Sequence, residues 1–118
     1  MRILSFSKRW QKLSNPVFTT FRFPRRDGDW QVGEMVQVYY KNRTPQRERL
    51  GEAKIINKEL RKIATVFEQY QPTEQEAIAD GFANLFEMNT WFRKTQRIFE
   101  EPINKLTLRW VKQSGGVG

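Results

Sequence analysis

The chain contains neither cysteine nor histidine, and these two absences remove large classes of protein function. Without cysteine there are no disulfides, thiolate metal sites or thiol nucleophiles. Without histidine there are no imidazole bases or imidazole ligands, which removes Ser–His catalytic triads and most zinc hydrolase designs. We therefore expect no cofactor and no metal ion. Any catalysis would depend on Lys, Glu, Asp, Thr, Ser or Tyr side chains.

Long apolar runs are missing as well. No segment approaches the roughly 20 apolar residues that a membrane-spanning helix needs, so we expect a cytoplasmic protein without membrane association. A hydrophobic fraction of 38%, with nine Phe and four Trp, is nevertheless enough to build a core in 118 residues. We expect a single domain over residues 1–113, followed by a flexible tail at 114–118.

Positive charge is in excess and is unevenly distributed. The chain has 21 Lys and Arg against 13 Asp and Glu, a net charge of +8. Residues 1–62 hold 15 of the basic and 6 of the acidic residues, whereas residues 63–118 hold 6 and 7. A cationic half joined to a nearly neutral half predicts one positive face and a polyanionic partner, nucleic acid first of all. The alternative is that the charge serves only solubility.

Alternation of apolar and polar residues predicts about five strands. The expected strands are residues 2–6, 17–23, 34–40, 51–57 and 104–111, the fourth continuing towards Leu60 and Ile63. Along residues 17–23, Thr20 and Arg22 fall on one face of the strand. Asp27-Gly28 supplies turn chemistry before the third strand, and residues 41–49 form a polar, cationic loop.

Helix signals lie in two places. Residues 8–13 predict a short N-terminal helix that ends at Asn15-Pro16. Thr73-x-x-Glu76 is a capping-box pattern, and Gly81 is a C-terminal stop for the first of two successive helices between residues 73 and 94. We expect the aromatic residues of this pair to be core: Phe82, Phe86, Trp91 and Phe92. The predicted fold class is α+β, a small mixed β-barrel with an N-terminal helix and a later helical pair that cover its openings.

The order of these elements resembles the ASCH domain, a branch of the PUA-like superfamily, over nearly the whole chain. Four segments carry the resemblance: Ile3-Leu4-Ser5-Phe6, Trp30-x-Val32-Gly33-Glu34, Glu76-Ala77-x-x-x-Gly81-Phe82 and Leu106-x-Leu108. The resemblance implies a PUA-like barrel that binds RNA in a cleft between the N-terminal helix and the barrel.

The family signature, Gly-x-Lys-x-x-Glu-x-Arg, falls here on Asn15, Val17, Thr20 and Arg22, so only the arginine is kept. Family members that hydrolyse 4-acetylcytidine are similar but have Thr at the Glu position, which Thr20 matches. They also have a distant Glu, near which Glu76 falls, and a lysine where this chain has Val17. The resemblance thus implies an alternative function, an amidohydrolase of an acetylated nucleoside; a ribonuclease is a further enzymatic alternative. The candidate catalytic residues are Thr20, Glu76 and a lysine from the preceding helix, Lys12.

The favoured hypothesis is RNA binding, to single-stranded or structured RNA. The candidate nucleic-acid-binding residues are Lys8, Trp10, Lys12, Arg22, Arg25, Arg26, Arg43, Arg47 and Arg49. We expect Arg22 to grip a phosphate or a base edge, Trp10 to stack on a base, and the loop cations to contact phosphates. Composition does not separate RNA from DNA, and DNA is the second candidate partner.

Each of these residues also has a structural alternative. Arg22 could form a surface ion pair with Glu34 or Asp29, and Trp10 could anchor its helix in the core. Thr20 could be an ordinary strand residue. Glu76 suits a helix cap.

Overall fold

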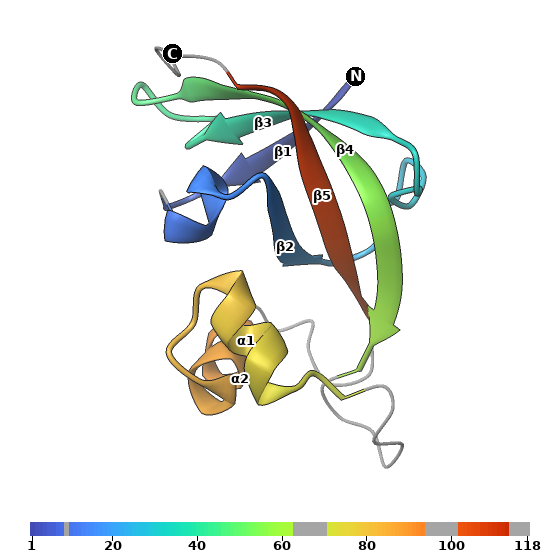
Figure 1. Ribbon diagram of the computed structural model, residues 1–118, viewed down its shortest axis with the longest axis vertical. Helices are drawn as coiled ribbons and strands as arrows, with labels where there is room; N and C mark the ends of the chain where they lie inside the picture. Colours follow the sequence, from blue (N-terminus) through green and yellow to red (C-terminus); the bar gives the residue numbers. More distant parts are fainter. Residues whose placement is uncertain (9, 63–70, 94–101, 114–118) are drawn as a thin grey trace.

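The protein is a five-stranded mixed sheet, curled into a half-barrel, with two helices after the fourth strand (Figure 1). A computed structural model describes residues 1–8, 10–62, 71–93 and 102–113. The sheet order is β1-β3-β4-β5-β2, and among the described residues only β1 and β3 pair in parallel. The strands are β1 Arg2–Phe6, β2 Val17–Arg22, β3 Met35–Tyr40, β4 Glu48–Arg61 and β5 Ile103–Gln113.

The predicted α+β class and the five strands are confirmed, with one extension. β4 begins at Glu48, so the end of the predicted 41–49 loop is strand. Tyr39 pairs with Arg49 and Tyr40 with Glu48, and a register shift follows Val38. The ladder therefore continues past Gly51 towards the turn. Ile63 and the predicted tail at 114–118 lie outside the described residues.

β2 and β3 follow each other in the sequence but do not pair. β2 forms one edge of the sheet, beside β5, and β1 forms the other, beside β3. The connection that contains Asp27-Gly28 therefore crosses from one side of the half-barrel to the other. Arg2 fixes this connection, because its guanidinium donates to both Glu34 carboxylate oxygens, at 2.7 and 2.6 Å, and stacks on Trp30 at 4.6 Å.

The N-terminal helix predicted over residues 8–13 is wrong. The structure has only a 3₁₀ turn, η1, at Gln11–Ser14, and Trp10 before it is extended. A helix needs several residues to nucleate, and Asn15 is kept out of the helical region by Pro16, with a ψ of 150°. Trp10 and Asn15, on either side of η1, are both extended, so the turn is not continued into a helix. Residue 9 lies outside the described residues.

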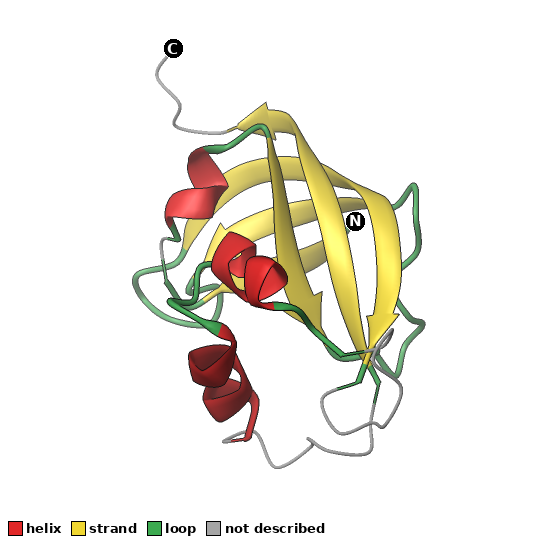
Figure 2. Cartoon of the chain, turned by 60° about the horizontal axis from the view of Figure 1, so that its bottom comes forward, coloured by secondary structure: helices red, strands yellow, loops and turns green. Residues whose placement is uncertain are grey.

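The later helical pair is confirmed as α1 Glu74–Asp80 and α2 Leu85–Arg93. Thr73 and Glu76 form the capping box, and Gly81 ends α1 in the left-handed conformation with a φ of 112°. Figure 2 shows the pair beside one end of the curled sheet. None of the helices that the structure describes has the length and apolarity to span a membrane.

The core consists of two clusters of buried side chains. One lines the inside of the half-barrel and includes Phe6, Phe18 and Trp30. The other joins the helices to the sheet through Phe21, Ala77, Phe82, Met88, Phe92 and Ile103. The core prediction is correct for Phe82 and Phe92 and wrong for two neighbours, since Phe86 is 76% and Trp91 40% exposed. A two-turn helix packed on one side buries only one stripe of residues, and these two lie outside it.

Candidate nucleic-acid interface

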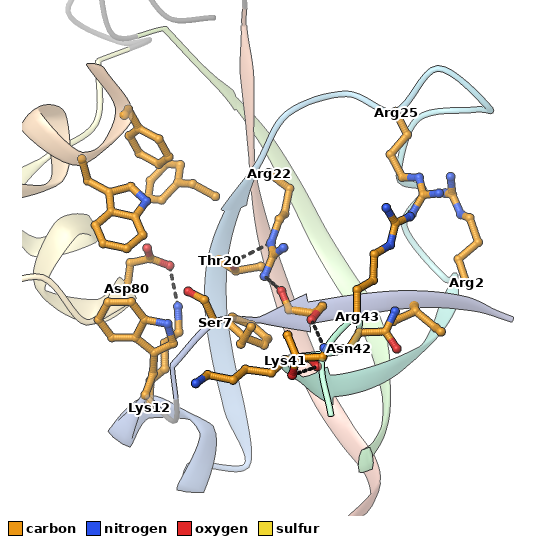
Figure 3. A pocket seen from close by; sticks show the side chains of 18 of the residues that line it. Arg2, Ser7, Lys12, Thr20, Arg22, Arg25, Lys41, Asn42, Arg43 and Asp80 are labelled. Carbon is orange, nitrogen blue, oxygen red and sulfur yellow. Dashed lines mark hydrogen bonds and ion pairs between the residues drawn. The ribbon is translucent and has the colours of Figure 1, made fainter. Parts of the chain in front are cut away.

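A pocket of about 980 Å³ lies where the half-barrel is open, between its edge strands β1 and β2. Its walls also include η1, the β3–β4 turn, and residues of α1 and α2 (Figure 3). Because β1 and β2 do not pair with each other, side chains rather than strand hydrogen bonds occupy the opening. The pocket is therefore a consequence of the incomplete closure of the sheet.

Cations dominate the charged groups that line the pocket. Six basic residues line it against one acidic residue, Asp80; the cations are Arg2, Lys12, Arg22, Arg25, Lys41 and Arg43. Arg2 and Arg25 already form ion pairs with carboxylates of the β2–β3 connection. Lys41 and Arg43 lie on the β3–β4 turn, and neither forms an ion pair with another residue that the structure describes. The pocket thus offers positive charge to an anion.

Arg22 bridges the two edges of the opening. From β2, its Nη2 donates to the Ser5 carbonyl of β1 at 2.8 Å, and its Nε donates to Thr20 Oγ1 at 3.2 Å. The guanidinium lies 4.7 Å from the Phe6 ring centroid. Burial lowers the pKa of Arg22 to about 10, although nearby Asp80 acts in the opposite direction. Glu34 and Asp29, the two carboxylates expected as alternative partners of Arg22, do not bind it. Glu34 pairs with Arg2, and Asp29 pairs with Lys58.

Thr20 and Arg22 lie side by side on the pocket face of β2, as their spacing predicts. The Thr20 side chain is buried, and its hydroxyl accepts the hydrogen bond from Arg22. Val17, at the position where the family resemblance expects a lysine, is 43% exposed and does not line the pocket.

A buried ion pair lies at the helical end of the pocket. Lys12 Nζ donates to Asp80 Oδ1 at 2.7 Å, and the two side chains are 6% and 8% exposed. Burial lowers the pKa of Lys12, partly offset by Asp80, and raises the pKa of Asp80, partly offset by Lys12. The Lys12 ammonium also lies over the rings of Phe6 and Trp10, at 5.3 and 5.6 Å.

Aromatic rings form the wall around this pair. Trp10 contacts Phe82, with ring centroids 5.5 Å apart, and Trp91, at 6.5 Å. Gly81 packs so closely on Trp10 that a Cβ there would lie 2.4 Å from the indole ring. Trp10 is thus packed against the C-terminal end of α1, although the helix that it was expected to anchor is absent, and it also lines the pocket.

The structure divides the predicted nucleic-acid-binding residues into two groups. Trp10, Lys12, Arg22, Arg25 and Arg43 line the pocket; Lys8, Arg26, Arg47 and Arg49 do not. Lys8 lies over the Trp10 and Trp91 rings, at 5.0 and 5.4 Å, so it stands next to the pocket. Arg47 stacks on Tyr39 at 4.9 Å, and Arg49 pairs with Glu52 at 3.6 Å.

The candidate catalytic residues are divided in the same way. Thr20 and Lys12 line the pocket, whereas Glu76 does not. Glu76 closes the capping box, binds Arg61 at 2.8 Å and binds Lys105 at 2.7 Å. Burial alone would raise the pKa of Glu76, but hydrogen bonds from Arg61, Lys105 and the Thr73 backbone outweigh it and lower the pKa to about 2.

Sequence reasoning missed the acidic member of the site, Asp80. One signal for it exists: an aspartate in the last turn of a helix, just before the Gly81 stop, opposes the helix dipole. An unfavourable placement of this kind indicates that the side chain is needed elsewhere. No group of three or more potential metal ligands occurs among the described residues.

Comparisons with known proteins add no relative. No protein-family model matches the chain, no curated protein matches it, and no solved structure matches it.

Proposed function

We propose that this protein is an RNA-binding domain of the ASCH type, within the PUA-like superfamily, and that RNA binds in the pocket between β1 and β2. The observation that carries the proposal is the composition of the pocket, with six cations on its walls and aromatic rings at one end. Cations bind the phosphates of nucleic acids, and aromatic faces stack on unpaired bases. The mixed half-barrel agrees with the coarse architecture that the family resemblance implies.

RNA is preferred to DNA because of the family resemblance. Arg22 remains at the one signature position that the chain keeps, and its guanidinium faces the pocket. A guanidinium presents several donors in one plane, and Arg22 makes two hydrogen bonds to residues that the structure describes. The remaining donors suit a phosphate or a base edge.

Anisotropy binding to labelled single-stranded RNA, duplex RNA and single-stranded DNA over a salt series tests this proposal. Replacing Lys41 and Arg43 together by alanine should weaken RNA binding and lower the slope of log K against log salt by roughly 1.4, since each phosphate contact on a single strand contributes about 0.7. The matched control is the Arg109→Ala/Lys112→Ala variant, because both residues are exposed on β5 and neither lines the pocket. Equal slopes in the two variants, or no RNA binding at low salt, would overturn the proposal.

A second candidate function is hydrolysis of an acetylated nucleoside. The observation that favours it is that Lys12 and Thr20 line the same pocket. Lys12 therefore brings an amine to the pocket, which Val17, at the position of the family lysine, does not. A lysine whose pKa is lowered by burial is a suitable base for a threonine hydroxyl. Incubation with 4-acetylcytidine, followed by chromatography, tests it. Turnover that is lost on Thr20→Val, with the fold retained, would support the enzyme, and no turnover by the unmodified protein would exclude this substrate.

A further inference from the structure

The Lys12–Asp80 pair has unused hydrogen-bonding capacity that faces the pocket. Asp80 Oδ1 accepts from Lys12, while Oδ2 has no hydrogen-bond partner among the residues that the structure describes. The ammonium of Lys12 has three donors, and its one hydrogen bond within the described part of the chain goes to Asp80. Both side chains are more than nine-tenths buried, and both line the pocket. One acceptor and at least one donor are therefore presented side by side.

Structural stability does not account for this pair. Buried ion pairs contribute little net stability, because desolvation of the charges offsets their attraction. Asp80 also lies at the C-terminal end of α1, where the helix dipole opposes a negative charge. Burial raises the pKa of Asp80 and lowers the pKa of Lys12, so each charge is held in an unfavourable environment. A ligand that hydrogen-bonds to both groups would satisfy them.

The surroundings of the pair suit a flat ligand. Trp91 is 40% exposed and lines the pocket, although it contacts Trp10 and Phe82 at 6.5 and 5.9 Å. An exposed indole at the edge of a pocket offers a stacking face. The opposite end of the pocket is cationic: in Figure 3, Lys12 and Asp80 lie at one end, and Arg2, Arg25 and Arg43 lie at the other.

We propose that the pocket receives one unpaired nucleotide of an RNA strand, with the Watson–Crick edge of its base on Asp80 and Lys12 and its flanking phosphates towards Lys41 and Arg43. This inference rests on the RNA-binding function proposed above. Every standard base carries a donor next to an acceptor on that edge: in uracil, N3–H donates to Asp80 Oδ2 and a carbonyl oxygen accepts from Lys12. In a duplex the same edge is occupied by the partner base, so the site selects unpaired bases.

The turn that carries the phosphate-side cations is held in place. The Asn42 backbone N–H donates to Ser5 Oγ at 3.1 Å, and the Lys41 N–H donates to the Phe6 carbonyl at 2.8 Å. Both bonds tie the turn to β1, which also carries the carbonyl that Arg22 binds. Lys41 and Arg43 are thereby anchored to the strand that borders the pocket.

The test measures anisotropy binding of the full chain to three labelled nonamers of equal charge: oligouridine, oligo-N3-methyluridine and an abasic ribose-phosphate strand. Methylation at N3 removes the donor and places a methyl group where Asp80 would accept. We expect oligouridine to bind about tenfold more tightly than the methylated strand, the effect of losing one charge-assisted hydrogen bond. The abasic strand should bind more weakly still, because it also loses the stacking on Trp91. Asp80→Asn should abolish the difference between oligouridine and its methylated form, whereas Arg109→Ala should retain it.

The outcomes separate this inference from the function on which it rests. Equal binding of all three nonamers would show that only phosphates are recognised, which overturns the single-base site and leaves RNA binding intact. Binding of none of them at low salt would overturn RNA binding itself. A thermal melt shows whether Asp80→Asn is folded. If it is not, binding of the three nonamers to the unmodified protein is sufficient to test the single-base site.

Discussion

Helix α1 carries two buried carboxylates, Glu76 and Asp80, in contrasting environments. Glu76 stands in the first turn, where the helix dipole favours negative charge, and accepts from Arg61, Lys105 and the Thr73 backbone. Asp80 stands in the last turn, where the dipole opposes it, and among the described residues its one hydrogen-bond partner is Lys12. The pKa of Glu76 is lowered to about 2, whereas the pKa of Asp80 is raised.

The difference shows how one short helix can serve two purposes. The Glu76 cluster joins α1 to the ends of β4 and β5, through Arg61 and Lys105, and so fixes the helical pair against the sheet. The Asp80 pair instead joins α1 to the 3₁₀ turn and faces the pocket. A carboxylate whose oxygens both have hydrogen-bond partners indicates a structural role. A carboxylate at a pocket with one oxygen lacking a partner indicates a site for a ligand.

The largest expected effect comes from separating Asp80 from Lys12. Asp80→Leu leaves a buried ammonium without its counter-charge and should lower the free energy of unfolding by about 3 to 5 kcal/mol. Adding Lys12→Met should restore most of that loss, because a buried ion pair exchanged for apolar side chains is often neutral. Urea denaturation of the two single variants and the double variant measures this. A double variant as unstable as Asp80→Leu would assign the pair a structural role like that of Glu76.

Glu76→Gln should cost about 3 kcal/mol of unfolding free energy, since it removes a buried charge from two cations at once. The control is Glu74→Gln on the same helix turn, where the side chain is exposed and the amide retains an oxygen for its contact to the Leu85 N–H. That control should stay within about 0.5 kcal/mol of the unmodified protein. A change below about 1 kcal/mol in Glu76→Gln, by the same denaturation method, would contradict a structural role for the cluster.

Acid should remove the contribution of Glu76 selectively. Its folded pKa, about 2, lies below the ordinary value of 4.5. Its stabilisation is therefore complete above about pH 4.5 and is lost as the pH falls towards 2. The unmodified protein should lose about 2 kcal/mol more than Glu76→Gln between pH 5 and pH 2.5. Asp80 does not produce this difference, because it is the same in both proteins. Parallel stability curves would refute the lowered pKa.

The two carboxylates also show what the sequence could predict. Thr73-x-x-Glu76 and Gly81 are local signals. They correctly predicted the position of α1 and the capping box that Glu76 completes. Asp80 meets Lys12, 68 positions away in the chain, and no local pattern encodes that contact. The alternation along β2 placed Thr20 beside Arg22, yet the carbonyl that Arg22 binds belongs to β1, at the opposite edge of the sheet.

The wrong predictions have a common cause. The N-terminal helix was expected from residues 8–13 alone, but Trp10 is extended and packs on Gly81 and Phe82, and only a 3₁₀ turn follows it. Phe86 and Trp91 were expected in the core because they are aromatic, but α2 buries only the side that faces Phe21 and Ile103. In both cases tertiary arrangement overrode residue preference. The exposed Trp91 then became part of the pocket wall.

The smallest expected effect concerns Glu76 in RNA binding. Glu76 does not line the pocket, and its oxygens are occupied by Arg61, Lys105 and the cap. Glu76→Gln should therefore change the affinity for single-stranded RNA by less than about twofold, under conditions where the variant is folded. Anisotropy titrations beside Asp80→Asn measure this. A tenfold loss of affinity in Glu76→Gln would instead indicate that Glu76 contacts the RNA. Such a contact would support the catalytic role that the family resemblance suggests for it. An unchanged affinity would agree with a purely structural role for Glu76.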